Sequence, residues 1–455
     1  MTTRSDADTP SAALSSVGAG GAVTVALCFL VAVLEGFDIQ AMGVAAPKLG
    51  AELHLAKDVL GEALSAANIG LVLGAILGGW LADQFGRKAV LIGAVLGFGV
   101  FTLLTMHARG FELLFLARLG AGFGFGAALP NIMALSAEVA PQGKRGSTGT
   151  MMFCGMPVGG GIVALISWLG LGLDWRHLFL IGGLAPLLLA PLIFFLMKEP
   201  PVSRERGVGG VNWRWLAVVP LYAASYLLLS WLGTLPGMGS IGALTPWLAA
   251  LPTVIIAYMV LHRAALFGEG QALQSVLLWA VFFPTLLILY LVLNWLPTLV
   301  IGKGFAHEAS LASVWFNFAS VVGALILGRL VDRFGLRWPM IAAYVGLVAS
   351  LVLLARANDL VAIMALSGAL GFFVLGANYA LYGAAASYYP AASRGRGSGA
   401  AVAWGRLGSV AGPLVGGYLL QGGASAGKVV SSMTPFAVAA LVGVFLLTLL
   451  AKPKH

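Results

Sequence analysis

The chain has 455 residues, of which 60% are hydrophobic and only 9% are charged, and its mean hydropathy is +0.96. A soluble domain carries about 25% charged residues, so this composition excludes a soluble domain and indicates a polytopic membrane protein. The net charge of +9 does not indicate nucleic-acid binding, because the basic residues lie in short loops between apolar runs.

Residues 1–21 are polar, and their Ser, Thr, Ala and Gly content predicts a disordered N-terminal segment. Twelve apolar runs follow, each of about 18–25 residues and therefore long enough to cross a bilayer as a helix. We expect an all-α membrane protein with six-helix halves at 22–200 and 271–451. The predicted spans are 22–46, 63–82, 89–107, 111–137, 147–170, 175–197, 273–299, 310–331, 338–356, 359–387, 397–420 and 431–451.

Two carboxylates, Glu35 and Asp38, lie in the first span, inside a stretch without a cation. A charge near the bilayer centre costs roughly 2.5–3.5 kcal/mol, so such residues usually mark an ion or proton path. Their i, i+3 spacing places both on one helix face. We expect Asp38, helped by Glu35, to carry a proton during transport. The alternative is a structural carboxylate that pairs permanently with Arg118 or Arg406.

The loops after the second and eighth spans carry the same motif. Gly79-Trp-Leu-Ala-Asp83-Gln-Phe-Gly86-Arg87-Lys88 returns as Gly328-Arg-Leu-Val-Asp332-Arg333-Phe-Gly335-Leu-Arg337, at an offset of 249 residues. The segments Pro141–Gly146 and Pro390–Gly395 are related by the same offset. Two motifs at one offset predict two homologous halves, as in transporters built from repeats.

The first copy of this loop motif can form a polar network with the ends of neighbouring helices. Asp83 can cap the N-terminus of a facing helix, and Arg87 can pair with Glu138 at the end of the fourth span. The alternative is a solvated loop that only sets topology. The predicted gate residues are Gly79, Asp83, Gly86, Arg87, Glu138, Asp332 and Arg333.

Two arginines lie within spans: Arg118 in the outer third of the fourth and Arg406 near the middle of the eleventh. A guanidinium holds a carboxylate through two parallel hydrogen bonds, which suits an organic-acid substrate. The alternative is charge balance for the acidic pair. The run Gly120–Gly126 misses the dinucleotide-binding pattern, because Phe125 replaces the third glycine, and instead predicts close helix packing.

The region 201–270 links the halves and holds two further apolar runs, at 214–233 and 243–262. Arg214 and Arg263 flank these runs, and an even number of extra spans preserves the orientation of both halves. We expect a membrane-spanning hairpin, giving twelve core spans plus two. The alternative is a hairpin that lies in the interface, which four prolines in the region favour.

Further candidates for substrate binding are polar and aromatic residues within spans. Rings can stack on an aromatic substrate, and amides can bond to a hydroxyl or a carboxylate. Each one alone is more often a helix–helix contact or an interface anchor than a substrate ligand, and Trp295 lies near a span end, where interface anchors occur. No metal site or cofactor is expected. These candidates are Asn131, Tyr290, Asn294, Trp295, Asn378, Tyr379 and Tyr382.

The distribution of Lys and Arg predicts the orientation. With the N-terminus inside, seventeen of these residues fall in inner segments and seven in outer loops. Because inner loops are enriched in positive charge, both termini are expected in the cytoplasm.

The repeated loop motif resembles the major facilitator superfamily, and the resemblance covers nearly the whole chain except about 208–262. Four segments are similar, more narrowly, to the aromatic acid:proton symporters, and Glu35 as the first acid is similar to transporters of 3-(3-hydroxyphenyl)propanoate. The resemblance implies that the acidic pair is required and that the gate network locks the outward-facing state. The four segments are Glu35–Gln40, Arg118–Asn131, Asn294–Pro297 and Gly405–Pro413.

We therefore expect a monomeric inner-membrane transporter that imports a hydroxyphenylpropanoate, benzoate or hydroxybenzoate type of acid by proton symport. Asp38 and Glu35 would take the proton, and Arg118 or Arg406 would hold the carboxylate. A proton-coupled exporter of the same fold is the alternative. An enzyme is not expected, because no catalytic His, Asp, Glu or Cys cluster is visible at a membrane face.

Overall fold

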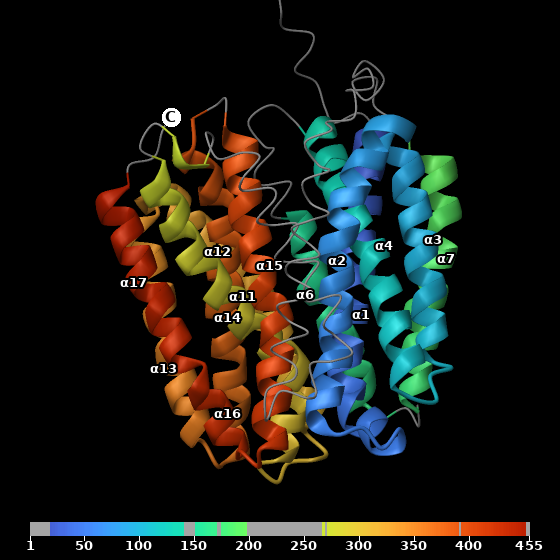
Figure 1. Ribbon diagram of the computed structural model, residues 1–455, viewed down its shortest axis with the longest axis vertical. Coiled ribbons are helices and arrows are strands. Elements are labelled where there is room, and N and C mark those ends of the chain that lie inside the picture. The colour runs from blue at the N-terminus through green and yellow to red at the C-terminus, as the bar shows by residue number, and fades with distance from the viewer. Residues whose placement is uncertain are drawn as a thin grey trace, which may run out of the picture.

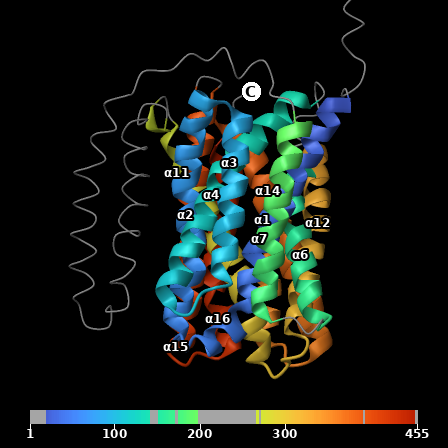
Figure 2. The ribbon, with the colours of Figure 1, turned by 90° about the vertical axis from the view of Figure 1, so that its right-hand side faces the viewer.

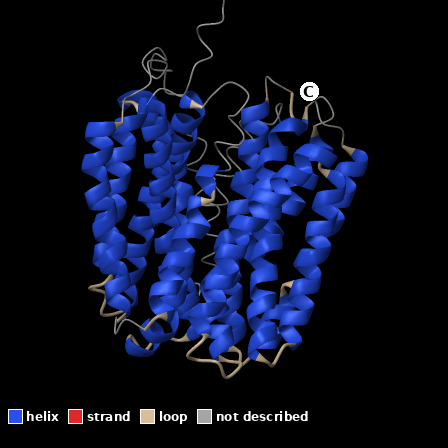
Figure 3. Ribbon diagram, turned by 180° about the vertical axis from the view of Figure 1, so that it is seen from behind, coloured by secondary structure: helices blue, strands red, loops and turns tan. Residues whose placement is uncertain are grey.

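The computed structural model describes residues 19–140, 151–170, 174–197, 266–268, 271–390 and 393–451. Within these ranges the regular structure is helical throughout (Figure 3). The predicted hairpin at 214–262 lies outside the described residues, as does nearly all of the N-terminal segment. Eleven of the described helices are long and apolar enough to cross a membrane.

The N-terminal half occupies one side of the molecule and the C-terminal half the other (Figure 1). Both halves pack their helices in the same pattern: α2 lies on α4 as α12 lies on α14, and α3 lies on α7 as α13 lies on α17. The first half contains α1 (Ala19–Glu52), α2 (Lys57–Phe85), α3 (Arg87–Thr105), α4 (Phe111–Val139), α6 (Gly155–Trp168) and α7 (Trp175–Leu196). The second contains α11 (Ala272–Ile301), α12 (Ala309–Phe334), α13 (Arg337–Arg356), α14 (Leu360–Ala385), α15 (Arg394–Gln421), α16 (Ala426–Ser432) and α17 (Thr434–Leu450).

Helix α15 crosses the bundle without being among the eleven apolar spans. It is rich in glycine and holds Arg394, Arg396 and Arg406, which lower its hydropathy. Its prediction as a span at 397–420 agrees with the observed helix.

Successive long helices alternate in direction, so the bundle has two ends. The terminal end is the one at which α2 ends, α3 begins and the described chain stops at Ala451; it is uppermost in Figure 1. The distal end is the opposite one, where α1 ends at Glu52 and α16 lies.

Helix α1 is longer than the predicted span 22–46. It continues through Pro47 and the exposed Lys48 to Glu52. The apolar run ends where the hydrocarbon ends, but a helix satisfies its own backbone and can extend into the headgroup region, where Lys48 reaches water.

Glycines in α4 allow its backbone to lie directly against α2. A Cβ at Gly122 would collide with the carbonyl oxygen of Ala67, and one at Gly126 with that of Leu71. The close packing predicted for the run Gly120–Gly126 is confirmed.

Hydrogen bonds join the two halves towards the distal end. From α2, Ser65 Oγ donates to the carbonyl of Val410 at 2.9 Å, and Asn68 Nδ2 to that of Ser409 at 3.0 Å, both on α15. Helices α6 and α12 lie side by side at the other edge of the interface (Figure 2). There the hydroxyls of Ser167 and Ser310 are 3.0 Å apart. The halves are therefore closed against each other on the distal side.

Candidate functional site

Asp38 forms a buried ion pair with Arg118. Arg118 Nη1 donates to Asp38 Oδ1 at 3.0 Å and Nη2 to Oδ2 at 2.5 Å, and Thr102 Oγ1 donates to Oδ1 at 3.0 Å. Both charged side chains are fully buried. In this conformation Asp38 is paired with Arg118, as in the alternative that treats it as a structural carboxylate. These hydrogen bonds join α1, α3 and α4 within the first half.

Glu35, one helical turn earlier on α1, has a different environment. It is equally buried, yet its Oε1 has no hydrogen-bond partner among the described residues. The charged groups that act on it are Arg406, which attracts it across the interface between the halves, and Asp38, which repels it. The two carboxylates predicted as a pair thus differ: Asp38 is hydrogen-bonded through both oxygens, whereas Glu35 Oε1 has no partner among the described residues.

Arg406 lies on α15 and is partly exposed. Its Nη1 donates to the phenol oxygen of Tyr290 on α11 at 2.9 Å. No carboxylate among the described residues lies within ion-pair distance of it, although Glu35 acts on it electrostatically. Arg406 is therefore a guanidinium with donors still available, whereas both Nη groups of Arg118 are occupied by Asp38.

Aromatic rings from both halves meet beside this arginine. Phe153 stacks on Tyr379 and on Tyr382, with ring centroids 6.0 and 6.3 Å apart. Tyr379 Oη also donates to the carbonyl of Phe153 at 3.1 Å, and Phe282 lies edge-on to Tyr382. Tyr382 also lies close to Arg406. The predicted Tyr379 and Tyr382 thus gather around Phe153, which was not predicted because nothing in the sequence distinguishes this phenylalanine from the other apolar residues of its span.

Two of the predicted amides bond within their own helices. Asn131 Nδ2 donates to the carbonyl of Ala127, and Asn294 Nδ2 to that of Tyr290, both at 2.8 Å. Both side chains are buried, and this back-bonding uses a donor that a substrate would otherwise take.

The remaining two predicted residues differ in their bonding. Trp295 is fully buried and donates to the carbonyl of Pro413 at 2.9 Å, so it anchors α11 to α15 rather than lying at the membrane interface. Asn378 is buried, and its Oδ1 lacks a partner among the described residues.

Gln40 forms a bridge that the sequence did not reveal. Its Nε2 donates to the Leu293 carbonyl of α11 at 3.1 Å and to Ser313 Oγ of α12 at 3.4 Å, and its Oε1 accepts from Asn317 Nδ2 at 3.0 Å. Gln40 lies two residues beyond Asp38, towards the distal end, and is buried. These contacts join the helix of the acidic pair to the opposite half. The quoted motif Glu35–Gln40 contained this residue, but its partners are more than 250 residues away.

The predicted gate residues lie at the terminal end. Arg87 and Glu138 form an ion pair. Gly86 makes the turn between α2 and α3 with a φ of 88°, a backbone conformation that residues with a side chain rarely adopt. Asp83 and Asp332 are exposed, and neither bonds to another described residue. Arg333 is also exposed and stacks on Phe334, while a Cβ at Gly79 would meet open space. Of the predicted network, the ion pair of Arg87 with Glu138 is therefore formed among the described residues, and the helix cap predicted for Asp83 is not.

A family model, the Major Facilitator Superfamily, matches residues 28–307 and 278–455 of this chain. The 3-(3-hydroxy-phenyl)propionate transporter of Escherichia coli (strain K12) is 34% identical over 93% of each chain. The 4-hydroxybenzoate transporter PcaK of Pseudomonas putida is 33% identical, covering 92% of this chain and 91% of that one. The gallate transporter of Pseudomonas putida is 34% identical, covering 87% and 84%.

The fold is also similar to that of solved structures. The inward open conformation of the xylose transporter XylE from E. coli superposes with a TM-score of 0.67 at 19% identity, covering 95% of this chain and 96% of that one. At that identity the likeness concerns the fold alone.

Proposed function

This chain belongs to the major facilitator superfamily, and on that premise we propose that it imports an aromatic carboxylic acid together with protons. Membership makes it a membrane transporter and not an enzyme. Relatives covering most of the chain are transporters of hydroxyphenylpropionate, hydroxybenzoate and gallate, which share an aromatic ring and a carboxylate. The substrate class follows from that shared chemistry.

The observation that carries this proposal is the partly exposed, carboxylate-free Arg406 beside aromatic rings from both halves. A guanidinium fork matches a carboxylate bidentately, and the ring of the same substrate gains from offset stacking on tyrosine or phenylalanine. Phe153, Tyr379 and Tyr382 supply such rings. Arg406 therefore holds the carboxylate, and Arg118 holds Asp38.

Glu35 takes the proton in the conformation seen here. An unpaired carboxyl buried in a membrane span costs less when it is neutral, so its protonation depends on whether water reaches it in each conformation. Asp38 already has three hydrogen bonds and can accept a proton only after Arg118 releases it. A carboxylate substrate bound near Arg406 changes the electric field at Glu35. Binding of the substrate is therefore linked thermodynamically to binding of the proton.

The transport path for the substrate opens alternately to the two faces of the membrane. The excess of basic residues in the terminal-end loops supports placing that end on the cytoplasmic side of the inner membrane. The contacts of α2 with α15 and of Gln40 with α12 then close the outer side. Opening to the outside requires these contacts to break, and the ion pair of Arg87 with Glu138 belongs to the gate that closes the cytoplasmic side.

The proposal is tested with purified protein in liposomes and labelled 4-hydroxybenzoate and 3-(3-hydroxyphenyl)propionate. An inward proton gradient is expected to drive accumulation, and a protonophore is expected to abolish it while leaving exchange of labelled for unlabelled substrate intact. Failure of both acids to exchange would contradict the substrate class. Exchange without gradient-driven accumulation would contradict proton coupling.

A further inference from the structure

Asn378 differs from the other buried asparagines of the described chain. Asn131, Asn294 and Asn317 each donate to the carbonyl four residues earlier in their own helix. Asn68 of α2 instead donates to the carbonyl of a residue on α15. Asn378 on α14 does neither: it is 3% exposed, and its Oδ1 has no hydrogen-bond partner among the described residues. A buried amide in this condition costs free energy and calls for an explanation.

The fold itself does not require an amide at this position. The two halves are related by an offset of 249 residues, and that offset places Leu129 of α4 at the position equivalent to Asn378. Leu129 is buried in an apolar cluster of the first half. A leucine therefore fills the equivalent position, and the amide in the second half is explained better by a partner that is not part of the chain.

Asn378 lies beside the aromatic rings of the central site. It directly precedes Tyr379 and lies one helical turn before Tyr382, and both tyrosines stack on Phe153. The i, i+4 spacing places Asn378 and Tyr382 on one face of α14. Since Tyr382 lies close to Arg406, the unpaired amide lies only about one turn farther along the helix than the residue beside the guanidinium.

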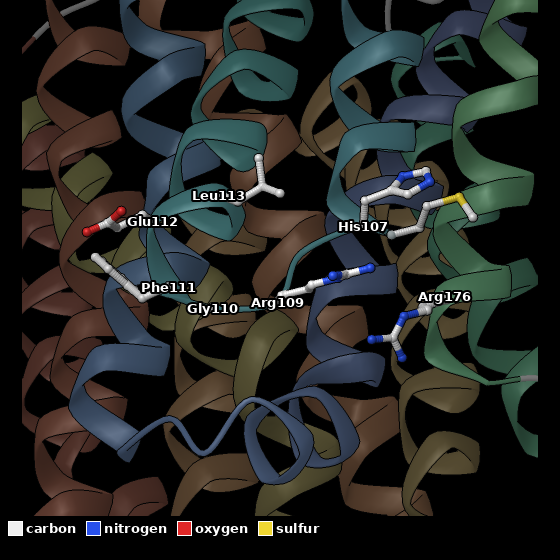
Figure 4. Close-up of a pocket in the computed structure, with 8 residues that line it drawn as sticks. His107, Arg109, Gly110, Phe111, Glu112, Leu113 and Arg176 are labelled. Carbon is white, nitrogen blue, oxygen red and sulfur yellow. The ribbon is translucent and has the colours of Figure 1, made fainter.

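A pocket at the distal end of the first half lacks such unpaired groups (Figure 4). It has a volume of about 950 Å³ and lies where the loop between α3 and α4 meets the start of α7. Arg176 in its lining is already paired with Glu52 at 2.7 Å and with Asp174 at 3.2 Å, and Glu112 adds a carboxylate. None of the described side chains that line it is a buried polar group without a partner. This pocket therefore gives no indication of a ligand.

We propose that Asn378 recognises a hydroxyl group on the ring of the transported acid, so that the protein prefers hydroxylated aromatic acids to their unsubstituted counterparts. The inference rests on the proposed function, in which Arg406 holds the carboxylate. In 4-hydroxybenzoate the carboxyl carbon and the hydroxyl oxygen are separated by about the length of one helical turn. The hydroxyl donates to Asn378 Oδ1, whereas a carboxylate can only accept and an unsubstituted ring can do neither.

The test is isothermal titration calorimetry of the full-length, detergent-purified protein with two pairs of acids. The pairs are 4-hydroxybenzoate with benzoate, and 3-(3-hydroxyphenyl)propionate with 3-phenylpropionate. Wild type is expected to bind the hydroxylated member of at least one pair about three- to tenfold more tightly, the effect of one neutral hydrogen bond. In Asn378→Leu this preference should disappear, because the hydroxylated acid loses affinity while the unsubstituted acid binds as it does to wild type.

Ser367→Ala is the matched control. Ser367 is also buried on α14, and its Oγ also lacks a partner among the described residues, but it lies roughly 16 Å earlier along the helix. This variant should keep the wild-type preference. Thermal unfolding in detergent tests the fold: Asn378→Leu should unfold at the wild-type temperature or above it, because it replaces an unpaired buried amide with the residue type of the equivalent position.

Equal binding of both members of each pair by wild type, or an unchanged preference in Asn378→Leu, overturns the assignment. A lower unfolding temperature of Asn378→Leu, or an equal loss of preference in Ser367→Ala, also overturns it, because the effect would then come from the folding of α14. Failure of wild type to bind any of the four acids would instead contradict the proposed function itself, so the two failures are distinguishable.

Discussion

The residues of the central site divide according to what already binds them. Both Nη groups of Arg118 are bonded to Asp38, whereas Arg406 and Glu35 lie across the interface with free bonding capacity. A composition argument treats both arginines alike, since each is a single cation in an apolar helix. Only the positions of their partners separate the residue that holds structure from the one available to substrate.

Replacing Arg406 with Gln should weaken binding of 4-hydroxybenzoate by roughly 10- to 100-fold, the effect of losing hydrogen bonds to a charged group worth about 1.5–3 kcal/mol. Isothermal titration calorimetry measures this affinity. Tyr290→Phe, which removes only the neutral partner of Arg406, should cost less. Equal affinity of Arg406→Gln and wild type would remove Arg406 from the substrate site.

Replacing Arg118 with Leu should destabilise the protein by about 3–5 kcal/mol, because Asp38 remains as an uncompensated buried charge. The double variant Arg118→Leu/Asp38→Asn removes that charge and should recover most of the loss. Thermal unfolding in detergent compares the three proteins. If the single and double variants unfold at the same temperature, the pair does not hold the helices together.

At the level of elements, hydropathy predicted the spans well, because a membrane helix must satisfy its own backbone and cover itself with apolar side chains. Even α15, with three arginines, was predicted as a span, since its apolar positions outnumber its charges. The contacts of Gln40 and Phe153 were not predictable. They depend on which helices of opposite halves become neighbours, and no local pattern encodes that pairing.

Gln40→Leu should open the distal side more often, because it removes three hydrogen bonds between α1 and the second half while conserving volume. A single cysteine at Ser310 reports this through labelling with a membrane-impermeant maleimide. Both native cysteines are buried and should react little.

The matched control is Gln274→Leu. Gln274 is also a buried glutamine, but its hydrogen bond to the Tyr388 carbonyl stays within the second half. Labelling should rise in Gln40→Leu and stay at the wild-type level in Gln274→Leu. Equal labelling in both would mean that Gln40 does not hold the halves together.

At the scale of the whole molecule, two repeated halves enclose a site whose ligands come from both. Residues of α1 bond to α11 and α12, and Glu35 is attracted by Arg406 of α15, so motion of one half against the other changes the surroundings of Glu35 and Arg406 together. The repeat was predicted from two motifs at one offset, and the observed helix packing repeats in the same way. Which end of the bundle is closed in this conformation could not be predicted, because one sequence encodes every conformation of the transport cycle.

Coupling between proton and substrate is tested most directly with Glu35→Gln in proteoliposomes. This variant cannot ionise at position 35, so it should still exchange labelled for unlabelled 4-hydroxybenzoate but should no longer accumulate it under an inward proton gradient. Accumulation equal to that of wild type would contradict the assignment of the proton to Glu35.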